Sequence, residues 1–226
     1  MHPRNLFVFL ALVAAAILPV RPAHAEDKAS VLARVLAQLD VAAKDFRTTT
    51  ATFEFDTIQT DPIPDTDTLA GTAYYERIDG HFKMAAHITA HQGRPTEKAY
   101  IFSGGVLRVS DTGKEKDAKP YTEVSKYESY LMLGFGASGK DLDEKWNVTY
   151  LRSEKISDTS VDVLELVAKD PKVRKLFSKV TIWLDTARAV SLKQVFDEGE
   201  GQSRVCTYSN IKVNEPLPKT AFSFDK

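Results

Sequence analysis

The chain has 226 residues, 43% of them hydrophobic, and a formal net charge of −1 from 30 basic and 31 acidic side chains. This balance argues against a nucleic-acid partner, which would select a basic face. The one cysteine, Cys206, excludes an internal disulfide, so the core alone must hold the fold. We interpret Cys206 as a small buried residue of a strand, because a catalytic thiol would need a nearby base that the sequence does not supply.

The N-terminus is typical of a secretory signal peptide. Arg4 supplies a positive charge, an apolar run extends from Leu6 to Val20, and Ala23-His24-Ala25 resembles a cleavage site. An uncleaved anchor is the alternative, but the run falls short of the roughly 20 residues that cross a bilayer. We expect removal of residues 1–25, which leaves one periplasmic domain over 26–226. Loss of Arg4 and Arg21 would leave 28 basic against 31 acidic side chains, a charge near −3.

The first segment of the expected mature chain is predicted to be an amphipathic helix over 29–46. Apolar residues recur there at helical spacing, and charged residues occupy the other side. The rest of the chain mostly alternates like short antiparallel strands joined by turns. The predicted strands are 50–59, 69–78, 81–90, 100–102, 107–109, 146–152, 161–168, 179–185, 190–196 and 203–213. We expect the helix to lay its apolar side on the sheet that these strands form.

Two turn signals predict hairpins and their register. Asp79-Gly80 is a strong hairpin signal between two of the strands. Gly104-Gly105 is the second signal. If these two glycines are the loop residues, Phe102 pairs with Leu107 and Tyr100 with Val109, so that four apolar side chains share one face.

A second, short and very hydrophobic helix is predicted over 124–135, where apolar residues again recur at helical spacing. It leads into Gly134-Phe-Gly-Ala-Ser-Gly-Lys140, which matches the letters of two nucleotide-binding motifs. Both motifs require a strand before the glycines and a helix after them, and here the predicted order is reversed. Asp141 also stands where a P-loop has Ser or Thr. We therefore interpret the glycines as the end of a helix and a turn.

Catalytic and metal-binding patterns are not evident. His81, His87 and His91 have the same parity along one predicted strand, but such spacings correspond to roughly 13–20 Å. Ligands of one metal lie near 2 Å from it, so we expect no metal site and no cofactor. The sequence contains no G-x-S-x-G, H-E-x-x-H or C-x-x-C motif. It gives no positive reason to predict an enzyme.

Five segments carry a resemblance to a known family. The run 46–55, FRTTTATFEF, is similar to a helix end followed by "F-x-A-x-F-x-Q", and 71–84, GTAYYERIDGHFKM, to "G-x-L-x-x-x-R-P-x-x-F-R-W". The run 101–109, IFSGGVLRV, is similar to "V-x-D-G-x-x-L-W-x-Y". Residues 180–185 and 209–224 look like the closing strands. In this order they resemble the periplasmic lipoprotein carrier family LolA, within the LolA/LolB/RseB-type superfamily of half-barrel lipid binders.

The resemblance implies an α+β fold, in which a strongly curved antiparallel sheet forms an unclosed half β-barrel and helices cover its concave apolar face. It implies a carrier that shields the acyl chains of lipoproteins in a cavity and delivers them towards the outer membrane. Partners would be acylated lipoproteins or other lipids, an inner-membrane ABC-type exporter and an outer-membrane acceptor, with the carrier a monomer. The candidate lining residues are Phe53, Phe55, Tyr74, Phe82, Met84, Phe102, Leu107, Leu131 and Phe135.

The family's functional arginine falls on Arg77, which we predict to hold down a lid made of the two helices by bonding helix carbonyls. Ile78 stands here in place of the family's proline, and Met84 and Arg108 in place of its tryptophans. An ordinary solvated arginine is the alternative for Arg77. At the level of function, two alternatives stay open: a protein of the same fold that senses or stores another lipid, and an envelope protein whose apolar side chains simply fill the core.

Overall fold

The computed structural model describes residues 27–78, 81–122 and 132–225. The predicted signal peptide, the Asp79-Gly80 turn and most of the predicted second helix lie outside these residues. Among the described residues, no helix is long and apolar enough to cross a membrane.

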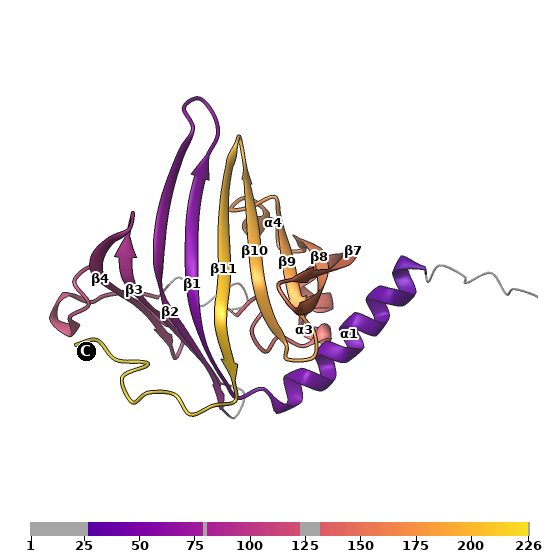
Figure 1. Cartoon of the computed structure of the whole chain (residues 1–226), viewed down its shortest axis with the longest axis horizontal. Helices are drawn as coiled ribbons and strands as arrows, with labels where there is room; N and C mark the ends of the chain where they lie inside the picture. Colours follow the sequence, from indigo (N-terminus) through magenta and orange to yellow (C-terminus); the bar gives the residue numbers. More distant parts are fainter. Residues whose placement is uncertain (1–26, 79–80, 123–131, 226) are drawn as a thin grey trace, which may run out of the picture.

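One antiparallel sheet of eleven strands forms the framework of the α+β fold (Figure 1). Its order is β6-β5-β4-β3-β2-β1-β11-β10-β9-β8-β7, so neighbours in sequence are mostly neighbours in space. In the described part of the chain β6 and β7 are the two edge strands, and they do not pair with each other, which leaves the sheet open. The strands are β1 (Thr48–Gln59), β2 (Asp65–Ile78), β3 (His81–His91), β4 (Arg94–Ser103), β5 (Val106–Ser110), β6 (Lys119–Tyr121), β7 (Trp146–Ile156), β8 (Thr159–Ala168), β9 (Lys179–Asp185), β10 (Val190–Gly199) and β11 (Gln202–Val213).

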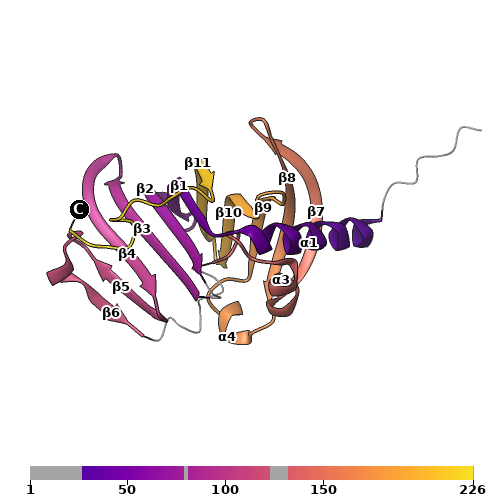
Figure 2. The same ribbon diagram turned by 90° about the horizontal axis from the view of Figure 1, so that it is seen from below.

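Within the described ranges, three helices pack on one face of this sheet, which we name the inner face. They are α1 (Lys28–Asp45), α3 (Gly139–Lys145) and α4 (Pro171–Arg174), and a 3-10 turn lies at Glu115–Asp117. The helices bury Val35, Leu142 and Val173 in one cluster with Leu164 and Ile182 of the sheet. Figure 2 shows the sheet bending across its width and α1 running across strands β10 to β7. The helical cover supplied by the described residues therefore lies mainly on one half of the inner face.

The sequence explains why α1 forms and where it packs. Val31, Val35, Leu39 and Ala43 recur every fourth residue, and all four are buried. Such a stripe gives a helix one apolar side to bury against a sheet. The predicted helix over 29–46 is thus confirmed to within one residue at each end.

The strand predictions hold in type, and the structure extends most of them. Phe102 pairs with Leu107 and Tyr100 with Val109, as the Gly104-Gly105 turn predicted. The strand β6 was not predicted, because it is only three residues long and exposed. The described end of the predicted second helix, residues 132–135, forms a turn and an isolated bridge from Phe135 to Val190 instead.

The glycines at 134–139 do not simply terminate a helix. Gly139 begins α3, and Ser138 caps that helix through a capping box with Asp141. The Asp141 amide donates to Ser138 Oγ (3.0 Å), and the Ser138 amide donates to Asp141 Oδ2 (3.2 Å). A Cβ at Gly139 would lie 2.1 Å from the Leu36 carbonyl oxygen, so glycine lets α3 approach α1. A helix therefore does follow the glycines, and the described residues directly before them, 132–133, form a turn.

The shared face predicted for His81, His87 and His91 is wrong. A register shift on β3 lies between Ile88 and Ala90, so His87 pairs with Thr72 whereas His91 pairs with Leu69. A bulge of this kind inserts one residue and reverses the alternation beyond it. His87 therefore lies on the outer face and His91 on the inner face.

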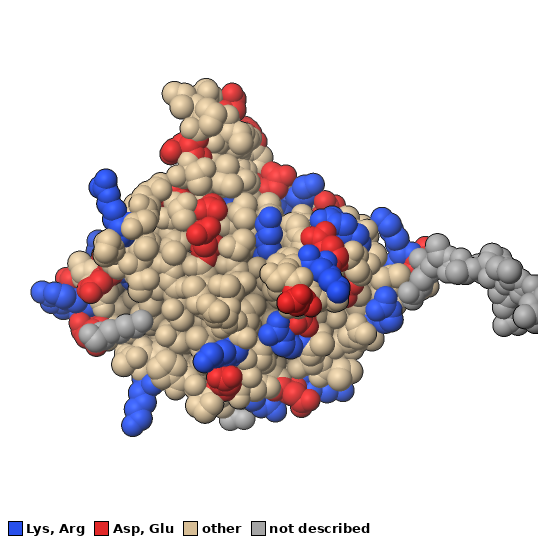
Figure 3. All heavy atoms as spheres, viewed as in Figure 1, with Lys and Arg blue, Asp and Glu red and all other residues tan. Residues whose placement is uncertain are grey.

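The chain ends on the outer face of the sheet. The tail 214–225 crosses beside β2 to β4, where Ala221 and Phe224 bury Tyr74, Ala85 and Ile101 (Figure 1). The buried His87 Nε2 donates to the Ala221 carbonyl oxygen (2.8 Å). Figure 3 shows Lys and Arg interspersed with Asp and Glu on the face it displays, rather than gathered in one basic patch.

Candidate lipid-binding cavity

A cavity of about 410 Å³ lies on the half of the inner face that α1 does not cover. Seven strands contribute to its wall: β1 to β5, β10 and β11. The lining is largely aliphatic and aromatic, with a few polar groups: Phe53, Phe55, Leu69, Ala73, Tyr75, Met84, Ala86, Ile88, Tyr100, Leu107, Gln194, Phe196, Arg204, Cys206 and Tyr208. Apolar cavities with a few converging polar groups are the usual form of small-molecule sites.

Four of the predicted lining residues line this cavity: Phe53, Phe55, Met84 and Leu107. Phe82, Phe102 and Phe135 do not line it, but they pack in the same hydrophobic cluster next to it. Leu131 lies outside the described residues.

The placement of Tyr74 towards the cavity is wrong, since Tyr74 packs on the outer face under the tail. Its neighbour Tyr75 lines the cavity instead. Register explains the exchange. Phe53 pairs with Gly71, so the residues of β2 with odd numbers face the cavity.

Polar groups of the cavity gather at its deep end, where Tyr75 and Gln194 are buried. Tyr208 Oη donates to Gln194 Oε1 (3.4 Å), and Gln194 Nε2 donates to the Leu133 carbonyl oxygen (2.5 Å). Burial raises the pKa of Cys206 to about 12, although a hydrogen bond with Tyr208 acts in the opposite direction. Burial also raises the pKa of Tyr75 and of Tyr208 well above the usual value for tyrosine. These groups are therefore neutral at physiological pH, and the deep end carries no charge.

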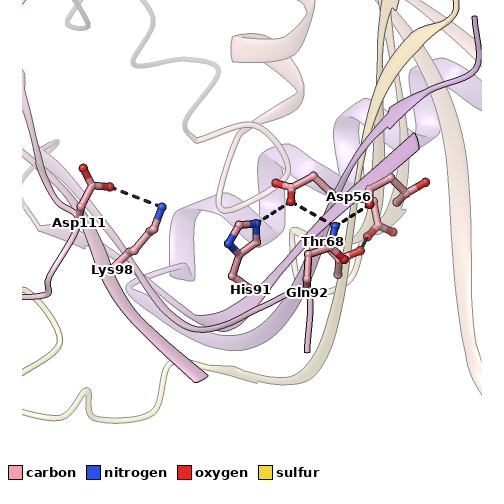
Figure 4. A network of polar contacts seen from close by, with 8 residues as sticks. Asp56, Thr68, His91, Gln92, Lys98 and Asp111 are labelled. Carbon is pink, nitrogen blue, oxygen red and sulfur yellow. Dashed lines mark hydrogen bonds and ion pairs between the residues drawn. The ribbon is translucent and has the colours of Figure 1, made fainter. Parts of the chain in front are cut away.

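Charged groups lie along one border of the cavity, which we name the mouth. Arg204 lines the cavity there, and its Nε lies 2.8 Å from Glu198 Oε1. His91, opposite the lining residue Leu69, places Nε2 2.6 Å from Asp67 Oδ1. Lys98, opposite Ile88, places Nζ 3.6 Å from Asp111 Oδ1. In Figure 4 the side chains of Lys98 and His91 point to the same side of the curved strands. The cavity is thus neutral in its depth and charged at its mouth.

The Gly134-Phe135-Gly136 run closes the deep end. The Ser191 amide donates to the Gly134 carbonyl (2.6 Å), and the Gly136 amide donates to the Ala189 carbonyl (2.8 Å). The fully buried ring of Phe135 stacks on Tyr75, with ring centroids 4.0 Å apart and planes at 9°. It also meets Tyr208 edge-on, with centroids 4.8 Å apart. The glycine motif therefore supplies an aromatic stop behind the cavity.

Arg77 lies beyond this stop, at the end of β2. Its Nη2 is 3.8 Å from Asp141 Oδ2 of α3, so its charged partner is a carboxylate where helix carbonyls had been predicted. Arg77 and Asp141 line a second, small cavity of about 90 Å³, together with Met132 and Leu133. Arg77 is thus placed to connect the sheet to α3, and any role in lid control stays a prediction.

A metal centre and a second groove are the other candidates for a functional site. Among the described residues, no group of three or more His, Cys, Asp or Glu side chains is placed to hold a metal ion. A wider groove of about 850 Å³ runs beside α1, but it is lined by Arg34, Asp45 and Arg188 among others. Its charged walls suit an acyl chain less well than the cavity over β1 to β5 does.

The wall contributed by β10 and β11 was not predicted from the sequence. Arg204, Cys206 and Tyr208 have the same parity along β11, a signal that could have grouped them. Which face they share depends on the pairing of β11 with β1, which joins residues at opposite ends of the chain. Nothing in local sequence reveals that pairing.

No protein-family model and no curated protein matches the sequence. Solved structures do match it. MucB is 12% identical with a TM-score of 0.53, over 87% of this chain and 63% of MucB. A LolA superfamily protein from Nitrosomonas europaea is 17% identical with a TM-score of 0.40, over 85% of this chain and 97% of that protein. The lipoprotein LppX from Mycobacterium tuberculosis is 15% identical with a TM-score of 0.46, over 83% and 97% respectively.

The protein has a LolA-like fold. This confirms the LolA-like fold that the sequence motifs indicated, whereas the strong curvature of a half β-barrel stays a prediction. At these identities the likeness concerns the fold alone, and the chain spans 63% of MucB. MucB has also been solved in complex with MucA from Pseudomonas aeruginosa, which is a property of MucB. The LolA-like fold therefore leaves the ligand of this chain to be argued from its own cavity.

Proposed function

We propose that the protein is a lipid-binding protein of the periplasm that shields acyl chains in the cavity over β1 to β5. The observation that carries this proposal is the cavity itself. Its volume is about 410 Å³ and its wall is mainly apolar, so a charged or strongly polar solute would lose its hydration there without gaining partners. The bend of the sheet supports the finer proposal of an unclosed half-barrel whose hollow side holds the ligand. The neutral deep end and the charged mouth fit an amphiphile that enters tail first.

The energetics suit a carrier. Burial of an acyl chain contributes about 0.8 kcal/mol per CH₂, so a chain of about 16 carbons gains roughly 12 kcal/mol before costs are subtracted. Part of this gain is offset by the ordering of the chain and by any rearrangement of the protein. Such a site holds lipid firmly in water and still releases it to a membrane or to an acceptor. We propose acylated lipoproteins as cargo, received from an inner-membrane ABC-type exporter and passed to an outer-membrane acceptor.

A second candidate is a binding protein of the same fold that senses a different lipid and reports it to a partner protein. The similarity in fold to MucB, which binds MucA, favours this candidate. The two functions differ in whether the lipid is passed on or whether its binding changes a protein contact.

Native mass spectrometry of the protein collected gently from the periplasm, with lipid extraction in parallel, tests both candidates. A co-purifying acylated lipoprotein supports the carrier function. A different bound lipid, together with a captured protein partner, supports the sensor function. A protein that carries no lipid and does not take up a fluorescent fatty acid contradicts lipid binding in either form.

A further inference from the structure

We infer that the cavity accepts one acyl chain at a time, and that the ring of Tyr75 sets the length of the chain that fits. This inference rests on the proposed function, since it names the size of ligand that the same cavity holds. The volume of the cavity, the closure of its deep end and the position of charge at its mouth support it.

The volume corresponds to a single chain. An apolar cavity of about 150 Å³ accommodates benzene, which gives a scale of roughly 25 Å³ for each carbon atom. On that scale the cavity of about 410 Å³ holds about 16 carbons. Two or three chains of ordinary length do not fit into this volume without a large rearrangement of the sheet. The ligand class is therefore a single-chain amphiphile, or one chain of a larger lipid.

The deep end is closed by stacked rings rather than by flexible side chains. Tyr75 is 5% exposed, lines the cavity, and stacks on Phe135 behind it. Phe82 also packs near Tyr75, with ring centroids 6.0 Å apart. Because Phe135 is held through the backbone bonds of Gly134 and Gly136, Tyr75 has a fixed support and cannot retreat as a ligand lengthens. A rigid end of this kind limits the length of the acyl chain that fits in the cavity.

The orientation follows from the position of charge. The deep end presents neutral hydroxyl, amide and thiol groups that already bond one another, so a charged head group would be desolvated there without a partner. At the mouth Arg204 is half exposed and paired with Glu198, and His91 and Lys98 lie on neighbouring strands. The methyl end of the chain therefore meets Tyr75, and the head group stays at the mouth.

The test is competition of saturated fatty acids, from about 10 to about 24 carbons, against a fluorescent fatty acid on the full mature chain. We expect the affinity of the wild type to rise about fourfold with each added CH₂ up to about 16 carbons, and then to level off or fall. In Tyr75→Ala this limit moves to longer chains, by up to about six carbons, because the removed ring is the size of benzene.

Three further variants test the role of the Tyr75 ring. Tyr75→Phe keeps the ring and loses the hydroxyl, so its limit stays at the wild-type length. Phe224→Ala removes a ring of the same size from the outer face, and its limit also stays unchanged. Ala73→Leu adds a side chain to the cavity wall without removing any packing, so its limit shortens by roughly three carbons. This last variant decides the question if Tyr75→Ala does not fold.

The outcomes separate this inference from the proposed function. If no fatty acid displaces the probe from the wild type, the proposed lipid binding fails, and the inference fails with it. If fatty acids bind but Tyr75→Ala and Ala73→Leu leave the length limit unchanged, lipid binding stands and the role of Tyr75 is overturned. If a diacyl phospholipid binds with both chains protected at wild-type affinity, the one-chain site is overturned. A lysophospholipid that binds like a fatty acid supports it.

Discussion

At the level of single residues, the glycines that match a nucleotide motif turn out to serve packing. Gly134 and Gly136 have φ values of +79° and +67°, in the left-handed region that other residues avoid. A Cβ at Gly136 would lie 2.4 Å from Cδ1 of Phe46, and one at Gly134 would lie 2.5 Å from Cβ of Ser191. These glycines let a tight turn carry Phe135 to the end of the cavity.

The substitution Gly136→Ala separates conformational strain from crowding. We expect it to lower the free energy of unfolding by roughly 2–4 kcal/mol, through the left-handed backbone and through overpacking against Phe46. Gly93→Ala is the matched control, because Gly93 has a φ of +69° with nothing within 4 Å of the added Cβ. That variant should lose only about 1 kcal/mol. Urea unfolding measures the loss of unfolding free energy in each variant. Equal losses would show that the Phe46 ring moves aside at no cost, so that crowding contributes nothing.

The Asp141 carboxylate predicts a dependence of stability on pH. Partial burial acts to raise its pKa, but hydrogen bonds from Ser138 and the charges of Arg77 and Lys145 outweigh this, and the pKa is lowered. A lowered folded-state pKa stabilises the protein above the ordinary aspartate range, and the stabilisation is lost as the pH falls through the folded-state pKa.

At neutral pH the unfolding free energy of Asp141→Asn should therefore be lower than that of the wild type, by up to about 1 kcal/mol, which is typical of a lost helix cap. In acid this difference should disappear, because the wild-type carboxylate is then protonated. Asp143→Asn, on the same helix, serves as the control. Urea unfolding at a series of pH values measures the difference, and a difference that persists unchanged in acid would contradict this account.

At the level of elements, the sequence predicted what local patterns determine and missed what distant pairing determines. The helix α1 and the β4–β5 register follow from spacing and from a two-glycine turn. The bulge on β3 reverses the faces of His87 and His91 and leaves no signal in alternation alone. Tyr74 was chosen in place of Tyr75 for a related reason. Two adjacent aromatic residues of a strand point to opposite faces, and only the pairing of β2 with β1 shows which of them faces the cavity.

The contact between β2 and α3 gives a prediction for Arg77. The ion pair of Arg77 with Asp141 joins the two elements across 3.8 Å, and exposed pairs of this kind contribute at most about 1 kcal/mol. If the pair favours the closed, empty state, Arg77→Leu should slow release of a bound fluorescent fatty acid by up to about fivefold.

The control is Lys83→Met, which breaks the pair of Lys83 with Glu76 (3.0 Å) on the outer face of the same hairpin. Stopped-flow transfer of the probe to vesicles measures release. An Arg77→Leu variant that releases the probe at the wild-type rate would remove Arg77 from lid control and leave it an ordinary solvated arginine.

At the scale of the whole molecule, the two faces of one sheet have different roles. Its inner face carries the helices over β7 to β10 and the cavity over β1 to β5. Its outer face is covered beside β2 to β4 by the tail. The same strands thus have a ligand cavity on one side and a fixed cover on the other. The tail prevents the back of the cavity wall from being exposed to water, which would leave the apolar residues Tyr74, Ala85 and Ile101 uncovered.

Removal of the tail should therefore weaken the fold more than it weakens lipid binding. A chain ending at Glu215 loses Phe224, whose burial alone contributes about 2 kcal/mol, and it loses the acceptor of the His87 hydrogen bond. We expect a lower melting temperature and increased binding of a hydrophobic dye, measured by calorimetry and by fluorescence. Lys219→Ala, an exposed substitution within the tail, should change neither. At a temperature where the shortened chain is still folded, it should bind a fatty acid with wild-type affinity, because the cavity lies on the opposite face. A shortened chain that keeps its stability but loses fatty-acid binding would mean that the tail shapes the cavity through the strands rather than simply covering their outer face.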